Sequence, residues 1–231
     1  MNVPRGELLR LLGWRGQETD GALLAKLDEA AARCLSFARP RSAVRRFSLT
    51  FLPADGPAAG GGQKYAGVAL EGAGVVLHSA DLAAHLQGCR EAYLLAVTIG
   101  EEAERELLRL SGTDMNAALL FDAAASCAVE SYADDVCADL AEGCGHALTA
   151  RFSCGYGDFP LQAQRDICAL LRTDVRIGLC CDESFLLTPR KSVTAVAGIT
   201  DKSRAQESGC AHKCAGCAKA DCAFRQREER T

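Results

Sequence analysis

The sequence is poor in aromatic residues and histidine, and it contains no long hydrophobic run. Aromatic residues make up 6% of the 231 positions, and only four are histidine. No stretch approaches the roughly 18 consecutive apolar residues of a membrane span, and the charged N-terminus lacks the features of a secretory leader. A formal net charge of −4 supplies no broad positive field for nucleic acid or anionic membranes. These absences predict a cytoplasmic protein that binds neither nucleic acid nor membrane.

Cysteine is the residue type that the chain has in excess, with 13 copies. An odd number of cysteines in a chain of this length without an export signal favours reduced thiols over disulfides. Nine of them are scattered between Cys34 and Cys181. Because free cysteine is commonly buried, we expect most of these nine to pack as small hydrophobic residues.

Hydrophobic periodicity divides the chain into three parts. Residues 1–40 read as two helices that form an N-terminal helical cap, with Thr19 and Asp20 as candidates for capping the second. Residues 41–200 contain strands in clusters separated by pairs of helices, without repeated βαβ spacing, which predicts an α+β domain around an antiparallel sheet. Residues 201–231 form a cysteine-rich tail.

Within the central domain, periodicity predicts individual elements. The apolar run from Ala92 to Ile99 indicates a buried strand. Helical spacing follows over residues 101–110, 114–142 and 161–171, and Ser79 precedes another short helix. Further strands are predicted by alternation in two places, through Val175, Ile177 and Leu179 and from Val193 to Ile199.

Residues 151 to 160 read Arg-Phe-Ser-Cys-Gly-Tyr-Gly-Asp-Phe-Pro and form the most informative segment. Glycines such as Gly155 let main-chain groups approach a ligand without an intervening Cβ, so the backbone can read an adenine edge. The guanidinium of Arg151 can bind a carboxylate through two hydrogen bonds. Composition alone also allows a plain surface turn with an arginine extending into solvent.

This loop resembles the S-adenosylmethionine loop of the activation domain of cobalamin-dependent methionine synthase, which carries an Arg-Pro-Ala-Pro-Gly-Tyr type of motif. Here the similar positions are Arg151, Ser153, Gly155, Tyr156 and Pro160. A second segment, Glu183-Ser184-Phe185 followed by Pro189 and Lys191, is similar to the Glu-Ser-Phe segment of that family. The resemblance covers roughly residues 90 to 200, and it implies a curved antiparallel sheet with helices grouped around it.

The resemblance also implies roles for individual residues. Arg151 would hold the methionine carboxylate of S-adenosylmethionine, the backbone near Ser153 and Gly155 would meet the adenine, and Tyr156 would lie toward the corrin face. The family uses acidic residues to bind the amino group and ribose of the ligand. Glu130, on the long predicted helix, is a candidate for this role, although it lies outside the two matching motifs. For Glu183 the alternative to ligand binding is a structural role.

The sequence departs from the family pattern in ways that bear on function. Phe152, Cys154 and Gly157 stand where the family loop often has prolines or small residues. No cobalamin-binding Asp-x-His-x-x-Gly segment is present, so the resemblance implies a corrinoid held by a separate methyltransferase partner. Reduction of its cobalt would require a flavodoxin- or ferredoxin-type electron donor. We therefore expect a stand-alone activation component that supports methyl transfer only in complex with its partner.

The tail adds a second candidate site. Cys210, Cys214, Cys217 and Cys222 form a CxxxCxxCxxxxC pattern, and His212 offers a substitute ligand. Four thiolates are the number that a tetrahedral zinc or a four-iron cluster takes. A competing hypothesis follows: a zinc or iron–sulfur interaction protein that keeps the activation fold as a docking surface for a corrinoid protein.

Overall fold

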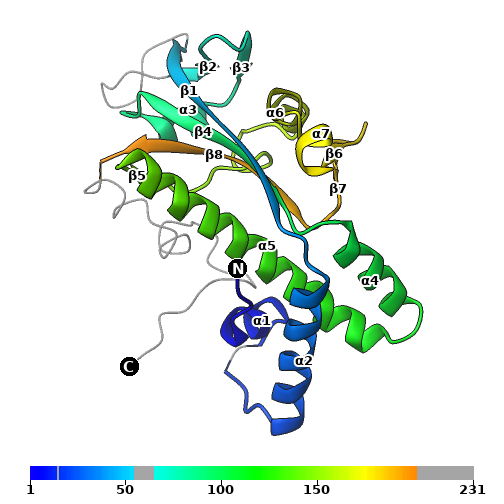
Figure 1. Ribbon diagram of the computed structural model, residues 1–231. Coiled ribbons are helices and arrows are strands. Elements are labelled where there is room, and N and C mark those ends of the chain that lie inside the picture. Colours follow the sequence, from blue (N-terminus) through cyan, green and yellow to red (C-terminus); the bar gives the residue numbers. More distant parts are fainter. Residues whose placement is uncertain (15, 55–64, 202–231) are drawn as a thin grey trace.

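The computed structural model describes residues 1–14, 16–54 and 65–201, and in them helices surround a central sheet (Figure 1). The helices are α1 Arg5–Leu11, α2 Gly21–Phe37, α3 Ala80–Leu86, α4 Glu101–Ser111, α5 Met115–Cys144, α6 Ala163–Leu171 and α7 Thr173–Ile177. The strands are β1 Arg41–Pro53, β2 Tyr65–Leu70, β3 Val75–Leu77, β4 Glu91–Thr98, β5 Ala147–Leu148, β6 Cys180–Cys181, β7 Leu187–Thr188 and β8 Ser192–Thr200.

The main sheet has the strand order β3-β2-β1-β4-β8-β5, and every neighbouring pair is antiparallel. Strand β4 lies between β1 and β8, with Leu94 opposite Val196 and Leu95 opposite Ala195. All four of these residues are fully buried. Since neighbouring residues on a strand point to opposite faces, both faces of the sheet must be covered, which explains the continuous apolar run of β4.

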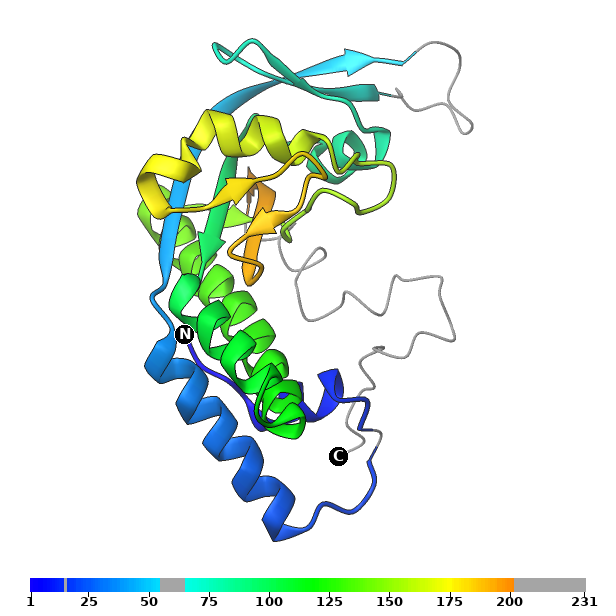
Figure 2. The ribbon, with the colours of Figure 1, turned by 90° about the vertical axis from the view of Figure 1, so that its right-hand side faces the viewer.

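One face of the sheet packs against α5, and α1, α2 and α4 extend the same core. Leu95 and Val97 of β4 lie in this cluster together with Phe121 of α5. Leu8 of α1 and Leu27 of α2 are fully buried in it as well. In Figure 2 these two N-terminal helices lie at the end of α5 opposite the β2–β3 hairpin.

Our division into segments 1–40, 41–200 and 201–231 stays a prediction.

The other face of the sheet is covered by α3, α6 and α7, which form a second core. Leu94 and Ala96 of β4 contribute to it, as do Leu82 of α3 and Ile167 of α6. Between α5 and α6 the chain passes from one face of the sheet to the other, by way of β5 and the loop that follows it. That loop contains the segment 151–160.

Local chemistry sets the helix boundaries. Asp20 caps α2 by accepting from the amide of Leu23 at 2.6 Å, so of the two capping candidates the aspartate performs this role. Ser79 caps α3 as expected, accepting from Leu82 at 2.9 Å. Helix α5 ends at Gly145, whose φ of 70° is the left-handed conformation that terminates many helices.

The strand predicted through Val175, Ile177 and Leu179 is wrong, because the structure has helix α7 there. Thr173 and Ile177, four residues apart, are both buried, and Val175 is 70% exposed. The Thr173 hydroxyl donates to the Leu179 carbonyl at 2.6 Å and closes this short helix. A five-residue alternation of apolar residues is too short to distinguish a strand from one turn of helix.

Among the helices of the described residues, none combines the length and hydropathy that crossing a membrane requires. Even the longest of them, α5, owes its apolar character largely to alanines that pack against the sheet and α2.

Candidate functional site

The segment 151–160 is an ordered loop that begins on the main sheet. Phe152 pairs with Val196 of β8 through two backbone hydrogen bonds, each of 2.9 Å. Beyond this bridge the chain turns back on itself, with Gly155 donating to the Phe159 carbonyl at 2.8 Å and Phe159 donating to Tyr156 at 2.9 Å. Gly155 has a φ of 88°, which a residue with a side chain rarely adopts.

Asp158 fastens the loop to the beginning of α3. Its carboxylate accepts hydrogen bonds from the Ser79 hydroxyl, from the Ala80 amide at 2.8 Å and from the Asp81 amide at 3.1 Å. In return, the Asp158 amide donates to the Asp81 carboxylate at 3.0 Å. Burial raises the pKa of Asp158, but these donors outweigh it and hold the pKa below its ordinary value.

Gly157 allows this fastening. A Cβ at Gly157 would lie 2.1 Å from a carboxylate oxygen of Asp81, and the backbone there has a φ of 53°. The hydrogen bonds between Asp158, Asp81 and Ser79 restrict the backbone of the loop.

Arg151 lies beneath two carboxylates of α5. Its side chain is only 5% exposed, and its guanidinium donates to Glu130 at 2.7 Å and to Asp134. Glu130 and Asp134 are one helical turn apart, so both reach the same guanidinium. Burial lowers the pKa of Arg151, but the two carboxylates outweigh this effect and raise it above its ordinary value. The arginine is therefore a fixed cation.

A cavity of about 660 Å³ adjoins this ion-pair cluster, a volume suited to a small organic ligand. The cavity brings together Glu130, Arg151 and Tyr156, three of the residues that the sequence singled out. Tyr156 is 52% exposed at its edge. Ser153 and Gly155 belong to the same loop but are not among the described residues that line the cavity. The lining residues are Asn2, Pro4, Glu7, Arg10, Leu11, Ser126, Cys127, Val129, Glu130, Ser131, Asp134, Arg151, Tyr156, Arg190, Lys191, Ser192 and Val193.

The N-terminal segment forms a wall of the cavity that sequence reasoning missed. The Asn2 amide donates to the Ser131 hydroxyl at 2.9 Å, and that hydroxyl donates to the Asn2 side chain at 2.9 Å. On α1, Arg10 pairs with Glu7 at 2.7 Å. The three-residue spacing of this ion pair is visible in the sequence, but its position against α5 depends on tertiary packing.

The second motif contributes to the cavity through its last part. Lys191 lines the cavity and contacts Asp122 and Ser126 of α5, each at 2.8 Å. Phe185 lies farther away, beneath the guanidinium of Arg165 at 5.0 Å, and its carbonyl accepts from Gln164 of α6 at 2.6 Å. Glu183 is exposed. The motif thus joins α6 to β8 and delivers a lysine to the cavity.

The nine cysteines from Cys34 to Cys181 are free thiols, and five of them are buried. These five confirm the expectation that most of the nine are buried, whereas Cys180 is exposed and Cys137, Cys144 and Cys181 are partly buried. Burial raises the pKa of Cys154 in the loop to about 12 and that of Cys127 in the cavity wall to about 11. The nucleophilic thiolate is therefore scarce at neutral pH at both positions.

The predicted tail site, formed by Cys210, Cys214, Cys217 and Cys222, lies outside the described residues and stays a prediction. In residues 1–14, 16–54 and 65–201, no group of three or more histidine, cysteine, aspartate or glutamate side chains is arranged to hold a metal ion.

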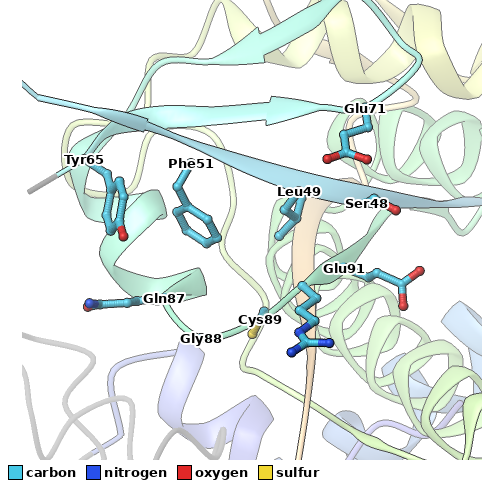
Figure 3. A pocket seen from close by; sticks show the side chains of 10 residues that line it. Ser48, Leu49, Phe51, Tyr65, Glu71, Gln87, Gly88, Cys89 and Glu91 are labelled. Atoms are coloured by element: carbon cyan, nitrogen blue, oxygen red, sulfur yellow. The ribbon is translucent and has the colours of Figure 1, made fainter. Parts of the chain in front are cut away.

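A second cavity, of about 650 Å³, lies between β1, β2 and the turn that joins α3 to β4. Phe51 and Tyr65 stand in it with ring centroids 5.0 Å apart, and Figure 3 shows both rings pointing toward the turn at Gln87 and Gly88. Neither of the two sequence motifs contributes a lining residue. We therefore identify the cavity beside Arg151 as the candidate site.

Comparison with known proteins identifies the fold. No family model matches the chain, and no curated protein does. Among solved structures, the chain is similar to the crystal structure of the MetH reactivation domain bound to AdoHcy, with a TM-score of 0.55 and 17% sequence identity. The match covers 79% of this chain and 67% of that chain. It confirms the predicted α+β fold with an antiparallel sheet and surrounding helices.

Proposed function

We propose that this protein binds S-adenosylmethionine in the cavity beside Arg151 and serves as the activation component of a cobalamin-dependent methionine synthase system. One observation carries the proposal. The fold shared with the MetH reactivation domain places Glu130, Arg151 and Tyr156 around a single cavity. The structure of that neighbouring domain contains AdoHcy, the product that S-adenosylmethionine becomes when it loses its methyl group.

The residues of the cavity suit the polar end of this ligand. Its amino acid part carries one carboxylate and one ammonium group. Arg151 holds three further N–H groups besides the two that bind Glu130 and Asp134, and these can receive the carboxylate. The carboxylates of Glu130 and Asp134 are 52% and 59% exposed, so they remain accessible to the ammonium.

The loop supplies the remaining contacts. Its backbone at Ser153 and Gly155, just outside the lining of the cavity, would meet the adenine where the ligand extends along the loop. The hydrogen bonds from α3 to Asp158 keep these groups in place before the ligand arrives. Tyr156 is half exposed and available to the partner. The contribution of this chain is to position the methyl group, since holding two reactants in line can lower a barrier by several kcal/mol, roughly 7–11 at the extreme.

The nucleophile comes from the partner. A cobalamin-binding methyltransferase protein supplies the reduced cobalt that accepts the methyl group, and a flavodoxin- or ferredoxin-type protein supplies the electron. The absence of an accessible thiolate at Cys127 and Cys154 agrees with a chain that only presents the methyl donor.

Calorimetric titration of the purified chain with S-adenosylmethionine tests the proposal. We expect saturable binding at one site, weakened about 10- to 100-fold by Arg151→Ala, as the loss of charge-assisted hydrogen bonds predicts. Arg90→Ala is the matched control, because Arg90 is an exposed arginine that lines the other cavity. Folded wild-type protein that shows no saturable binding would refute the proposal.

Tyr156→Ala separates ligand binding from partner function. We expect this variant to bind S-adenosylmethionine nearly as well as the wild type, and to support slower methylation of the partner's cobalamin. A large loss of S-adenosylmethionine affinity in this variant would instead place the tyrosine against the ligand.

A further inference from the structure

The arrangement of charge around Arg151 points to a selectivity that the proposed function does not by itself require. The arginine side chain is 5% exposed, and the two carboxylates above it are more than half exposed. Each carboxylate uses one oxygen for the guanidinium: Oε2 of Glu130 and Oδ1 of Asp134. Among the described residues, none forms a hydrogen bond to the other oxygen of either carboxylate, and both side chains line the cavity. A ligand therefore meets two exposed carboxylates together with the small part of the guanidinium that lines the cavity.

This cluster carries a net charge of −1, because one guanidinium faces two carboxylates. Two of the other cations in the cavity wall are compensated locally, because Arg10 pairs with Glu7 and Lys191 pairs with Asp122. The backbone amide of Arg190 donates to Glu104 at 3.0 Å, and its exposed side chain also lines the cavity. The wall at α5 thus attracts cations, and Arg190 offers a separate contact for an anionic group.

S-adenosylmethionine has two cationic groups near one end, the ammonium and the sulfonium. Three carbon atoms join them, so they stand at most about 5 Å apart. Carboxylates at positions i and i+4 of a helix start from Cβ atoms about 5–6 Å apart. Glu130 and Asp134 therefore match the spacing of the two positive charges of the ligand.

We propose that Asp134, together with Glu130, makes the cavity select S-adenosylmethionine over S-adenosylhomocysteine, and that Arg151 positions the two carboxylates for this purpose. This inference rests on the proposed function. When the methyl group leaves, the carbon–sulfur bond breaks, its electron pair stays on sulfur, and the sulfonium becomes a neutral thioether. The nucleophile of the partner accepts the methyl group. The product thus loses one of its two positive charges, which favours its release.

Equilibrium titration of the full chain with both ligands tests this selectivity. At ~50 mM salt, where screening is weak, we expect the wild type to bind S-adenosylmethionine roughly five- to tenfold more tightly than S-adenosylhomocysteine. Asp134→Asn should reduce this ratio to about two, mainly by weakening S-adenosylmethionine, and Asp134→Glu should restore much of it. Sinefungin, in which a carbon atom that bears an ammonium group replaces the methylated sulfur, should bind like S-adenosylmethionine.

Asp139→Asn is the matched control, since Asp139 is exposed on the same helix and does not line the cavity. We expect it to leave the ratio unchanged. Glu130→Gln repeats the test if Asp134→Asn fails to fold, which thermal unfolding of each variant reveals. Equal wild-type affinities for the two ligands, or equal losses for both ligands in Asp134→Asn and Glu130→Gln, would overturn the selectivity while leaving the proposed function intact. A wild-type chain that binds neither ligand would overturn both.

Discussion

Replacing Arg151 by alanine should destabilise the fold even without a ligand. The substitution removes a buried side chain and two charge-assisted hydrogen bonds, which contribute about 1.5–3 kcal/mol each when fully desolvated. Because Glu130 and Asp134 are 52% and 59% exposed, water replaces part of what they lose. We therefore expect a loss of about 2 kcal/mol, which in a domain of this size lowers Tm by roughly 4–8 °C.

Urea unfolding followed by circular dichroism measures this loss as a lower midpoint with an unchanged slope. The loss of stability should disappear or reverse when Arg151→Ala is introduced into a variant that already carries Glu130→Gln and Asp134→Asn. There the guanidinium is a buried cation without a counter-ion, so removing it should be neutral or stabilising. If Arg151→Ala lowers the free energy of unfolding of the wild type by less than about 0.5 kcal/mol, or by the same amount in both backgrounds, the ion pairs do not stabilise the fold as we infer.

Three further predictions concern the loop and the thiols. Asp158→Asn should destabilise the protein at neutral pH, as measured by urea titration. The difference in stability from wild type should shrink as the pH falls below 3.8, the ordinary pKa of aspartate, because the lowered pKa of Asp158 gives stability that protonation removes. A difference that grows in acid would contradict this. Gly157→Ala should lower the free energy of unfolding by roughly 1–2 kcal/mol in the same assay and weaken ligand binding, because the Cβ of the alanine would meet Asp81 and the backbone there is left-handed. An unchanged urea midpoint would show that the loop is not held to α3 at this residue. Alkylation at pH 7.5 followed by peptide mass spectrometry should modify the exposed Cys180 well before the buried Cys154, whose pKa is raised to about 12; the reverse order would place Cys154 at the surface.

The parts of the fold that the sequence predicts are those in which local pattern and burial agree. Strand β4 is apolar at nearly every position because both of its faces are buried, and the run from Ala92 to Ile99 reveals this directly. The loop at 151–160 is recognisable because Gly155 and Gly157 occupy backbone conformations that favour glycine. Helix α7 was missed because its alternation spans only five residues.

The candidate site was only partly predictable, because its contacts join segments distant in sequence. Asp134 follows Glu130 by one helical turn, so its position on the same face of α5 could have been inferred from spacing. That both carboxylates bind Arg151 depends on how β5 returns the chain across α5. The wall formed by Asn2 and Arg10 depends on the docking of α1 and has no motif that identifies it.

A structure determined from crystals of the protein grown with S-adenosylmethionine most directly tests the central claim, that this ligand binds in the cavity beside Arg151. We predict ligand density in the cavity between α1, α5 and the 151–160 loop, with the amino acid end against Glu130, Asp134 and Arg151. Density in the cavity lined by Phe51 and Tyr65 instead, or no bound ligand at saturating concentration, would contradict this account.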